Sequence, residues 1–137
     1  MRLRVGYNVP AMNVPDELRY SKDHEWARVE DGRVRIGITD YAQDALGDVV
    51  FVQLPAVGTT VTLGESFSEV ESTKSVSDIY APVAGTVVEV NNDLTDAPQR
   101  LNEDPYGEGW IAVIDPEDPA QVENLLDAAG YRELVEG

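Results

Sequence analysis

One stretch decides the fold, residues 66–82: Ser66-Phe67-Ser68-Glu69-Val70-Glu71-Ser72-Thr73-Lys74-Ser75-Val76-Ser77-Asp78-Ile79-Tyr80-Ala81-Pro82. Its β-favouring residues lie on both sides of a short run of serine and threonine, which are turn-tolerant. Pro82 closes the second half, because proline has no N–H to donate to a strand ladder. The pattern predicts a β-hairpin with Lys74 at its tip, where a flexible stem holds the amine away from the sheet.

Lysine is scarce in this chain. Lys22 and Lys74 are its two lysines, against eight arginines. A guanidinium stays protonated at any ordinary pH, whereas an ammonium can lose its proton and act as a nucleophile. Most exposed lysines are simple solvated charges, and that is the plain alternative for Lys74. Its place on a hairpin tip indicates an amine that another enzyme modifies.

Composition excludes several classes of function. The formal charge is 10 − 26 = −16, with a pI near 4.1. Phosphate backbones and anionic membranes repel such a protein, so we expect neither a nucleic-acid nor a membrane partner. The absence of cysteine excludes disulfides and thiol chemistry. No apolar run has membrane-spanning length and no signal peptide is evident, so we expect a cytoplasmic protein. We also expect it to be monomeric when free.

Length and strand pattern predict one mainly β domain. We expect residues 1–18 to form a flexible N-terminal extension and residues 19–137 to form the domain. Short strands punctuated by Gly and Pro indicate a compact barrel or sandwich. The expected early elements are a strand over 20–29, a turn at Asp31-Gly32, a strand over 33–38, a short helix over 40–46 capped by Thr39 and stopped by Gly47, and a central strand over 48–54.

An internal echo supports a barrel of two similar halves. Pro55-Ala56-Val57-Gly58-Thr59-Thr60-Val61 resembles Pro82-Val83-Ala84-Gly85-Thr86-Val87-Val88. Each copy enters a strand after a turn, and the lysine hairpin lies between the copies. A pseudo-symmetric flattened barrel, with the hairpin at one end, is therefore expected.

The C-terminal part predicts a loop, a strand and a helix. The polar connection over 91–109 is long enough to be functional or held by its own contacts. A strand follows over 110–114. Asp118 is then expected to cap a helix, with Gln121 completing a capping box and Gly130 ending it. Its apolar stripe packs on the barrel.

Few residues could support catalysis by this chain alone. His24 is the single histidine, and the sequence has neither a Gly-x-Ser-x-Gly elbow nor a phosphate-binding glycine loop. No His-rich metal site can form, and no metal ligand is assigned. His24 is best interpreted as a hydrogen-bonded structural residue. A small hydrolase using His24 and Glu25 is the remaining enzymatic alternative.

Several motifs together resemble one family. They are Asp23-His24-Glu25-Trp26, Gly37-Ile38-Thr39-Asp40-Tyr41-Ala42-Gln43, Leu46-Gly47-Asp48-Val49-Val50-Phe51-Val52, Val70-Glu71-Ser72-Thr73-Lys74-Ser75-Val76-Ser77-Asp78 and Asn102-Glu103-Asp104-Pro105-Tyr106-Gly107-Glu108-Gly109-Trp110. From about residue 20 to 131 the chain resembles the H protein of the glycine cleavage system. The resemblance implies a lipoyl/biotinyl-type flattened barrel-sandwich, with a short helix after the early strands and a C-terminal helix.

The resemblance also implies a carrier rather than an enzyme. Lys74 would bear lipoate in amide linkage, attached by a lipoylating enzyme. The arm would take an aminomethyl group from a pyridoxal-phosphate glycine decarboxylase to a tetrahydrofolate-dependent aminomethyltransferase. Lipoamide dehydrogenase would then reoxidise it. The domain over 19–137 would be the lipoyl-carrier domain of glycine catabolism and one-carbon metabolism.

Further site residues follow from the resemblance alone. It implies that Glu25 and Asp78 line a cleft that shelters the loaded arm, with Asp23 standing where some members have serine. It assigns Glu71 and Gly58 to recognition by the lipoylating enzyme, with Gly58 keeping a neighbouring turn low.

Other interpretations stay open at this point. Biotinyl carrier domains share the hairpin lysine but resemble Met-Lys-Met at the tip, where this chain has Thr73 and Ser75. Lipoyl domains of 2-oxo acid dehydrogenases are shorter and adjoin Pro/Ala-rich linkers. An H-like protein can also relay lipoyl groups to other enzymes. From a different class, a non-catalytic acidic β-barrel interaction module fits the composition.

Overall fold

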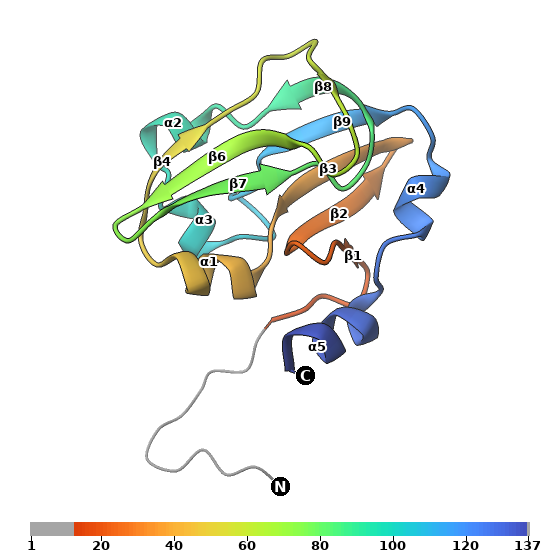
Figure 1. Cartoon of the computed structure of the whole chain (residues 1–137). Helices are drawn as coiled ribbons and strands as arrows, with labels where there is room; N and C mark the ends of the chain where they lie inside the picture. The colour runs from red at the N-terminus through yellow and green to blue at the C-terminus, as the bar shows by residue number, and fades with distance from the viewer. Residues whose placement is uncertain (1–12, 137) are drawn as a thin grey trace, which may run out of the picture.

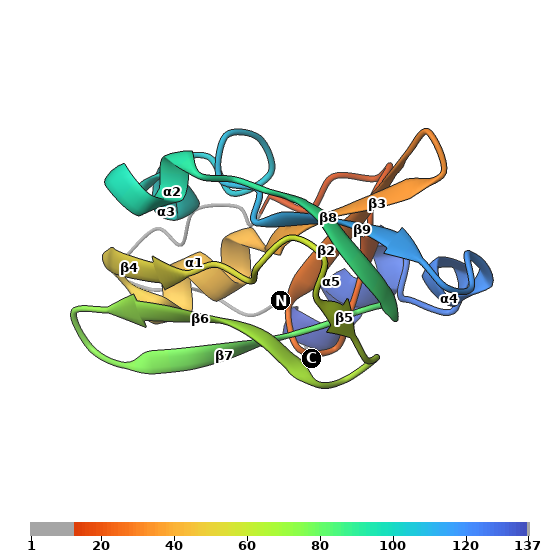
Figure 2. The ribbon, with the colours of Figure 1, turned by 90° about the horizontal axis from the view of Figure 1, so that it is seen from above.

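The computed structural model describes residues 13–136, and two antiparallel sheets face each other across its core (Figures 1 and 2). The mainly β architecture confirms the expected flattened barrel-sandwich. The elements are β1 (Arg19–Tyr20), β2 (Glu25–Glu30), β3 (Arg33–Ile38), α1 (Asp40–Leu46), β4 (Val49–Gln53), β5 (Thr60–Val61), β6 (Ser66–Ser72), β7 (Val76–Tyr80), β8 (Gly85–Val90), α2 (Asp93–Asp96), α3 (Arg100–Glu103), β9 (Ala112–Pro116), α4 (Ala120–Glu123) and α5 (Ala128–Glu136).

The larger sheet has the strand order β1-β2-β3-β9-β8-β5. The β2–β3 turn places Asp31 at φ 52° and Gly32 at φ 80°, the left-handed pair that a two-residue hairpin needs. Val34, Ile36 and Ile38 are all buried on the inner face of β3. The alternating pattern of this strand therefore predicted its buried face correctly.

The smaller sheet has the order β4-β6-β7, which makes β6 its central strand. The prediction that residues 48–54 form a central strand is wrong, because β4 lies at the edge. Its pairing with β6 shifts register between Val49 and Phe51, so Val50 and Phe51 both face outward and are about half exposed. A bulge places two consecutive side chains on the same face of a strand. The apolar run of β4 is therefore not the sign of a strand that is buried on both faces.

The two copies of the Pro-x-x-Gly-Thr echo lead into strands that pair with each other. β5 and β8 are antiparallel neighbours, with Thr60 opposite Thr86 and Val61 opposite Gly85. A Cβ at Gly85 would collide with the backbone of Asp115 in β9, so only glycine permits this close approach. The strands differ in length, two residues against six, so the two halves are unequal.

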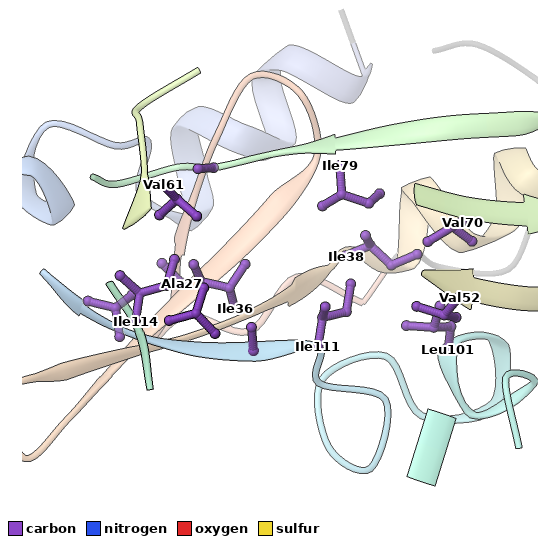
Figure 3. Packing of buried hydrophobic residues seen from close by; sticks show 14 of the residues in the cluster. Ala27, Ile36, Ile38, Val52, Val61, Val70, Ile79, Leu101, Ile111 and Ile114 are labelled. Carbon is purple, nitrogen blue, oxygen red and sulfur yellow. The ribbon is translucent and has the colours of Figure 1, made fainter. Parts of the chain in front are cut away.

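Two clusters of buried side chains hold the layers together. In the larger cluster Ile38 and Ile79 lie between the sheets, with Val52, Val70 and Leu101 gathered at one end (Figure 3). The second cluster joins β1 and β2 to α5 and contains Val14, Leu18, Tyr20, Trp26, Tyr106, Ala128 and Tyr131.

The early strand predicted over 20–29 is interrupted. Residues 21–24 form a turn between β1 and β2, in which the Ser21 hydroxyl accepts hydrogen bonds from the N–H groups of Asp23 and Glu25, at 3.2 and 3.1 Å. His24 has φ 74° and ends this turn. The side chain of Ser21 thus competes with the ladder for backbone donors.

The single C-terminal helix predicted from Asp118 to Gly130 is also wrong. The Asp118 carboxylate does accept a hydrogen bond from the N–H of Ala120 at 3.0 Å, but α4 ends at Glu123. Leu126 then exchanges two 2.8 Å backbone hydrogen bonds with Tyr20, and this bridge to β1 separates α4 from α5. Gly130 lies inside α5. Gln121 makes no capping box, because its amide oxygen accepts the N–H of Ala84.

The expected N-terminal extension is described only from residue 13. Val14 and Leu18 are 3% and 1% exposed, and the Arg132 guanidinium donates to the Val14 carbonyl at 2.7 Å. These residues therefore pack on α5 as part of the second cluster. The expectation for residues 1–12 lies outside the described part of the chain. Within residues 13–136, no helix has the length and apolar character needed to cross a membrane.

Candidate functional site

The β6–β7 turn is held by hydrogen bonds to the Ser72 hydroxyl and to backbone carbonyl groups. The Ser72 hydroxyl accepts from the N–H groups of Lys74 and Ser75, at 3.1 Å each, and the Ser72 N–H donates to the Ser75 carbonyl. Thr73 donates to the carbonyl of Asp48, just before β4, at 3.0 Å. The turn therefore holds the root of Lys74 in a defined position.

The Lys74 side chain is exposed and lies over Gly47. Gly47 ends α1 at φ 79°, and a Cβ there would come within 2.9 Å of Lys74 Cε. The backbone conformation therefore favours glycine here, while the flexible end of the lysine side chain could move away from a Cβ. Among residues 13–136, Lys74 Nζ makes no ion pair or hydrogen bond. The amine is open to a modifying enzyme.

Asn102 of α3 supports the segment beneath this lysine. Its Nδ2 donates to Gly47 O at 2.8 Å and to Gln43 Oε1 at 3.1 Å, while its Oδ1 accepts the Val49 N–H at 2.9 Å. Asn102 is thus linked to the hairpin through Asp48 and Thr73. The sequence predicted no role for Asn102, which occurs only within one of the motifs of the family resemblance. The hydrogen-bond partners of an asparagine cannot be predicted from its neighbours in sequence.

A cleft of about 300 Å³ runs between α1 and the free edge of β7. Asp23 and Asp78, two of the three residues expected to shelter the arm, line it. Asp78 Oδ1 accepts a hydrogen bond from the Ser66 hydroxyl at 3.0 Å. The remaining lining residues are His24, Ile38, Tyr41, Ala42, Ala45, Leu46, Ser75, Val76, Ser77 and Ile79. The lining of the cleft therefore includes Ser75, the residue that follows Lys74, and two carboxylates.

His24 at the wall of this cleft is tied into a hydrogen-bonded network. Its Nδ1 lies 2.8 Å from the Tyr131 hydroxyl, which lies 2.7 Å from Thr39 Oγ1. The ring also packs against Tyr41, with centroids 4.6 Å apart. Burial lowers the pKa of His24, an effect that the nearby Asp23 opposes. His24 thus joins α1 and α5 as a structural residue, which the sequence had indicated.

Glu25 lies beside the cleft but does not line it. It is 1% exposed; its carboxylate accepts the Ser21 hydroxyl at 2.5 Å and the Tyr80 N–H at 3.3 Å. Burial raises the pKa of Glu25 to about 7, although both hydrogen bonds oppose this shift. The carboxyl therefore titrates near neutral pH, and it fastens the turn that carries Asp23.

The structure places Glu71 and Gly58 far apart along the strands. Glu71 pairs with Val76 at the last position before the lysine turn. Gly58 follows β4, whose register leads away from that turn, and its N–H donates to Val87 of β8 at 2.7 Å. The β4–β5 connection lies at the opposite end from the hairpin tip (Figure 2). Gly58 has φ 95°, and a Cβ there would meet nothing within 4 Å, so this glycine meets a need of the backbone.

Comparison with known proteins agrees with this geometry. The family model described as glycine cleavage H-protein matches residues 18–137. The chain is 58% identical over 124 residues to the glycine cleavage system H protein of Geobacillus thermodenitrificans (strain NG80-2), covering 90% of this chain and 98% of that protein. The H protein of Anaeromyxobacter sp. (strain K) is 55% identical over 125 residues, covering 91% and 98%. A crystal structure of the H protein from Mycobacterium marinum is similar, with a TM-score of 0.84 and 47% identity over 90% of this chain and 100% of that one. The chain therefore belongs to the glycine cleavage H-protein family, the lipoate-bearing carriers of that system, and is a carrier component rather than an enzyme.

Proposed function

We propose that Lys74 is the residue that carries lipoate, and that its arm moves an aminomethyl group between enzymes. The donor would be the pyridoxal-phosphate glycine decarboxylase, and the acceptor the tetrahydrofolate-dependent aminomethyltransferase. Lipoamide dehydrogenase would restore the arm. The observation that carries this proposal is an exposed amine, without a partner among the described residues, on a pinned turn beside a cleft.

The residues around Lys74 fit such a group. When attached, lipoate supplies a dithiol that accepts and releases the carried unit. Amide formation removes the positive charge of Lys74, so the arm root is no longer attracted to this acidic protein. Ile38 and Ile79, which are buried, give the cleft an apolar wall, and such a wall would reduce the access of water to a group held there. This wall would protect a hydrolysable aminomethyl group.

Carboxylates supply the complementary charge. Asp23 and Asp78 line the cleft, and an aminomethyl amine is cationic at neutral pH. Glu25 acts at one remove, as a positioning residue, because its carboxylate holds the Ser21 side chain that in turn binds the Asp23 N–H. The sheltering role expected of Glu25 is therefore proposed to be indirect.

A lipoylating enzyme would have to recognise the hairpin and modify Lys74 before the arm could carry an aminomethyl group. Glu71 lies on β6 beside the turn and is a candidate contact for that enzyme. Gly58 lies at the other end of the strands, so any part it has in recognition would act through the shape of the barrel. Its role in recognition stays a proposal.

Intact mass after expression in a lipoylating host tests the assignment. The wild-type chain should gain one lipoyl increment, which Lys74→Arg should lose. Lys22→Arg is the matched control, because Lys22 is the other lysine of the chain and should leave the increment unchanged. Glycine breakdown should also cease when Lys74→Arg is combined with the other three components. Continued turnover by Lys74→Arg, or loss of the increment in Lys22→Arg, would contradict the proposal.

A further inference from the structure

Helix α1 forms the wall of the cleft opposite β7, through Tyr41, Ala42, Ala45 and Leu46. The helix has seven residues, and among them only Leu46 is buried. A helix this short is not stable by itself, so it keeps its place through contacts with the rest of the fold. The position of the cleft wall therefore depends on the groups that hold the two ends of α1.

Asn102 of α3, which lies beside α1 (Figure 1), holds the C-terminal end of this helix. Its Nδ2 donates to the Gly47 carbonyl and to Gln43 Oε1, and its Oδ1 accepts the Val49 N–H. The amide thus binds the end of α1, the side of α1 and the start of β4 at once. An aspartate of the same shape could keep only the contact with Val49, because carboxylate oxygens accept but do not donate.

The same contacts reach the turn that carries Lys74. Asp48 lies between the two residues whose backbone groups bind Asn102, and its carbonyl accepts the Thr73 N–H at 3.0 Å. Thr73 directly precedes Lys74. One side chain of α3 therefore fixes the cleft wall and the root of the arm relative to each other.

We infer that Asn102 is a positioning residue of the carrier, which aligns the cleft wall with the root of Lys74 so that the arm rests in the cleft. It acts through α1 and the β6–β7 turn rather than by contact with the carried group. Without its two donors, the end of α1 moves relative to the turn. An arm of fixed length then spends less time in the cleft, and its load is more open to water. This inference rests on the proposed function of Lys74.

Amide exchange in the unmodified chain gives the first test, because it needs no lipoate. Asn102→Asp removes both donors but keeps the shape and the acceptor. Exchange at the Gly47 and Thr73 N–H groups should become about three- to tenfold faster, which is the scale of one lost hydrogen bond. Asn102→Ala adds no charge and should change exchange in the same direction, so it replaces the aspartate variant if that chain does not fold.

Asn91→Asp is the matched control. The Nδ2 of Asn91 donates to the carbonyls of Glu108 and Trp110 at 2.7 and 2.8 Å, and its Oδ1 accepts one backbone N–H. Asn91 is 4% exposed, so loss of these bonds should lower the thermal midpoint at least as much as Asn102→Asp does. Asn91 does not line the cleft, and its substitution should leave exchange in α1 and in the lysine turn unchanged.

The second test uses the lipoylated carrier, loaded with an aminomethyl group by the glycine decarboxylase and then separated from that enzyme. Water breaks the carbon–sulfur bond of the load, which returns one thiol with its proton and releases formaldehyde and ammonia. The chain has no cysteine, so a thiol reagent follows this reaction with no contribution from the rest of the protein. Hydrolysis should be about three- to tenfold faster in Asn102→Asp than in the wild type, again the scale of one lost hydrogen bond, and unchanged in Asn91→Asp.

Unchanged exchange at Thr73 in Asn102→Asp would overturn the inference. So would equal hydrolysis in Asn102→Asp and the wild type, or an equal acceleration by Asn91→Asp, since lost stability would then explain the effect. A wild-type load that hydrolyses as fast as the aminomethyl adduct of free dihydrolipoamide would instead contradict the sheltering cleft of the proposed function. The exchange test on the unmodified chain would still decide whether Asn102 joins the cleft wall to the lysine turn.

Discussion

Replacement of Glu25 by glutamine should change how the stability of this protein depends on pH. Burial raises the pKa of this carboxyl to about 7 from an ordinary value of 4.5. The folded state therefore holds the proton more tightly than the unfolded state. Its contribution to stability is fully present below pH 4.5 and is lost as the pH rises through about 7.

The size of the effect follows from the two pKa values. The difference between them corresponds to about 3 kcal/mol in full, at roughly 1.36 kcal/mol for each pH unit. About 2.5 kcal/mol of this falls between about pH 5 and pH 8, where the protein is away from its pI. The free energy of unfolding of the wild type should fall by that amount relative to Glu25→Gln over this interval.

Urea unfolding followed by tryptophan fluorescence measures this difference, because Trp26 is fully buried. Comparing each protein with itself at two pH values removes any constant offset from altered hydrogen bonding to Ser21 and Tyr80. Glu123→Gln is the control, since this exposed side chain stays in water in both states. Parallel pH profiles for the wild type and Glu25→Gln would refute the reasoning.

Three further substitutions test the packing around the site. Asn102→Ala removes three hydrogen bonds and should lower the free energy of unfolding by about 2 kcal/mol, with faster amide exchange at Val49; unchanged exchange would contradict the support assigned to Asn102. Tyr131→Phe removes the hydroxyl between His24 and Thr39 and should cost about 1–2 kcal/mol in thermal unfolding, whereas an unchanged melting point would count against the network. Gly37→Ala places a Cβ 2.7 Å from the Trp26 indole and should cost about 1–3 kcal/mol, with an altered tryptophan spectrum as its signature.

The elements that the sequence predicted well depend on near neighbours. Thr39 was expected to cap α1, and its hydroxyl accepts the Ala42 N–H at 3.2 Å. The turn at Asp31-Gly32 and the hairpin with Lys74 at its tip were also predicted correctly from residues close together in the sequence. Caps, turns and strand alternation are decided within a few residues, so local chemistry is sufficient to predict them.

The wrong predictions concern elements whose structure depends on contacts with residues far away in the sequence. The helical pattern after Asp118 is real, but two hydrogen bonds to Tyr20 at Leu126 interrupt it more than a hundred residues from their partner. The apolar run of β4 predicted a central strand, yet the bulge opposite Glu71 turned half of it outward. Neither contact can be predicted from the hydrophobic pattern of the neighbouring residues.

The sequence by itself determined a lysine at a hairpin tip, the motifs of its family and a strongly acidic surface. The family motifs implied that Asp23 and Asp78, 55 positions apart in the sequence, line one cleft, and they do. Tertiary structure alone decided that Glu25, two residues from Asp23, is buried beside that cleft instead of lining it. It also decided that Asn102 braces the segment under Lys74. The physical reason is that burial, and with it the pKa of a carboxyl, depends on which strands and helices surround a side chain rather than on its neighbours in sequence.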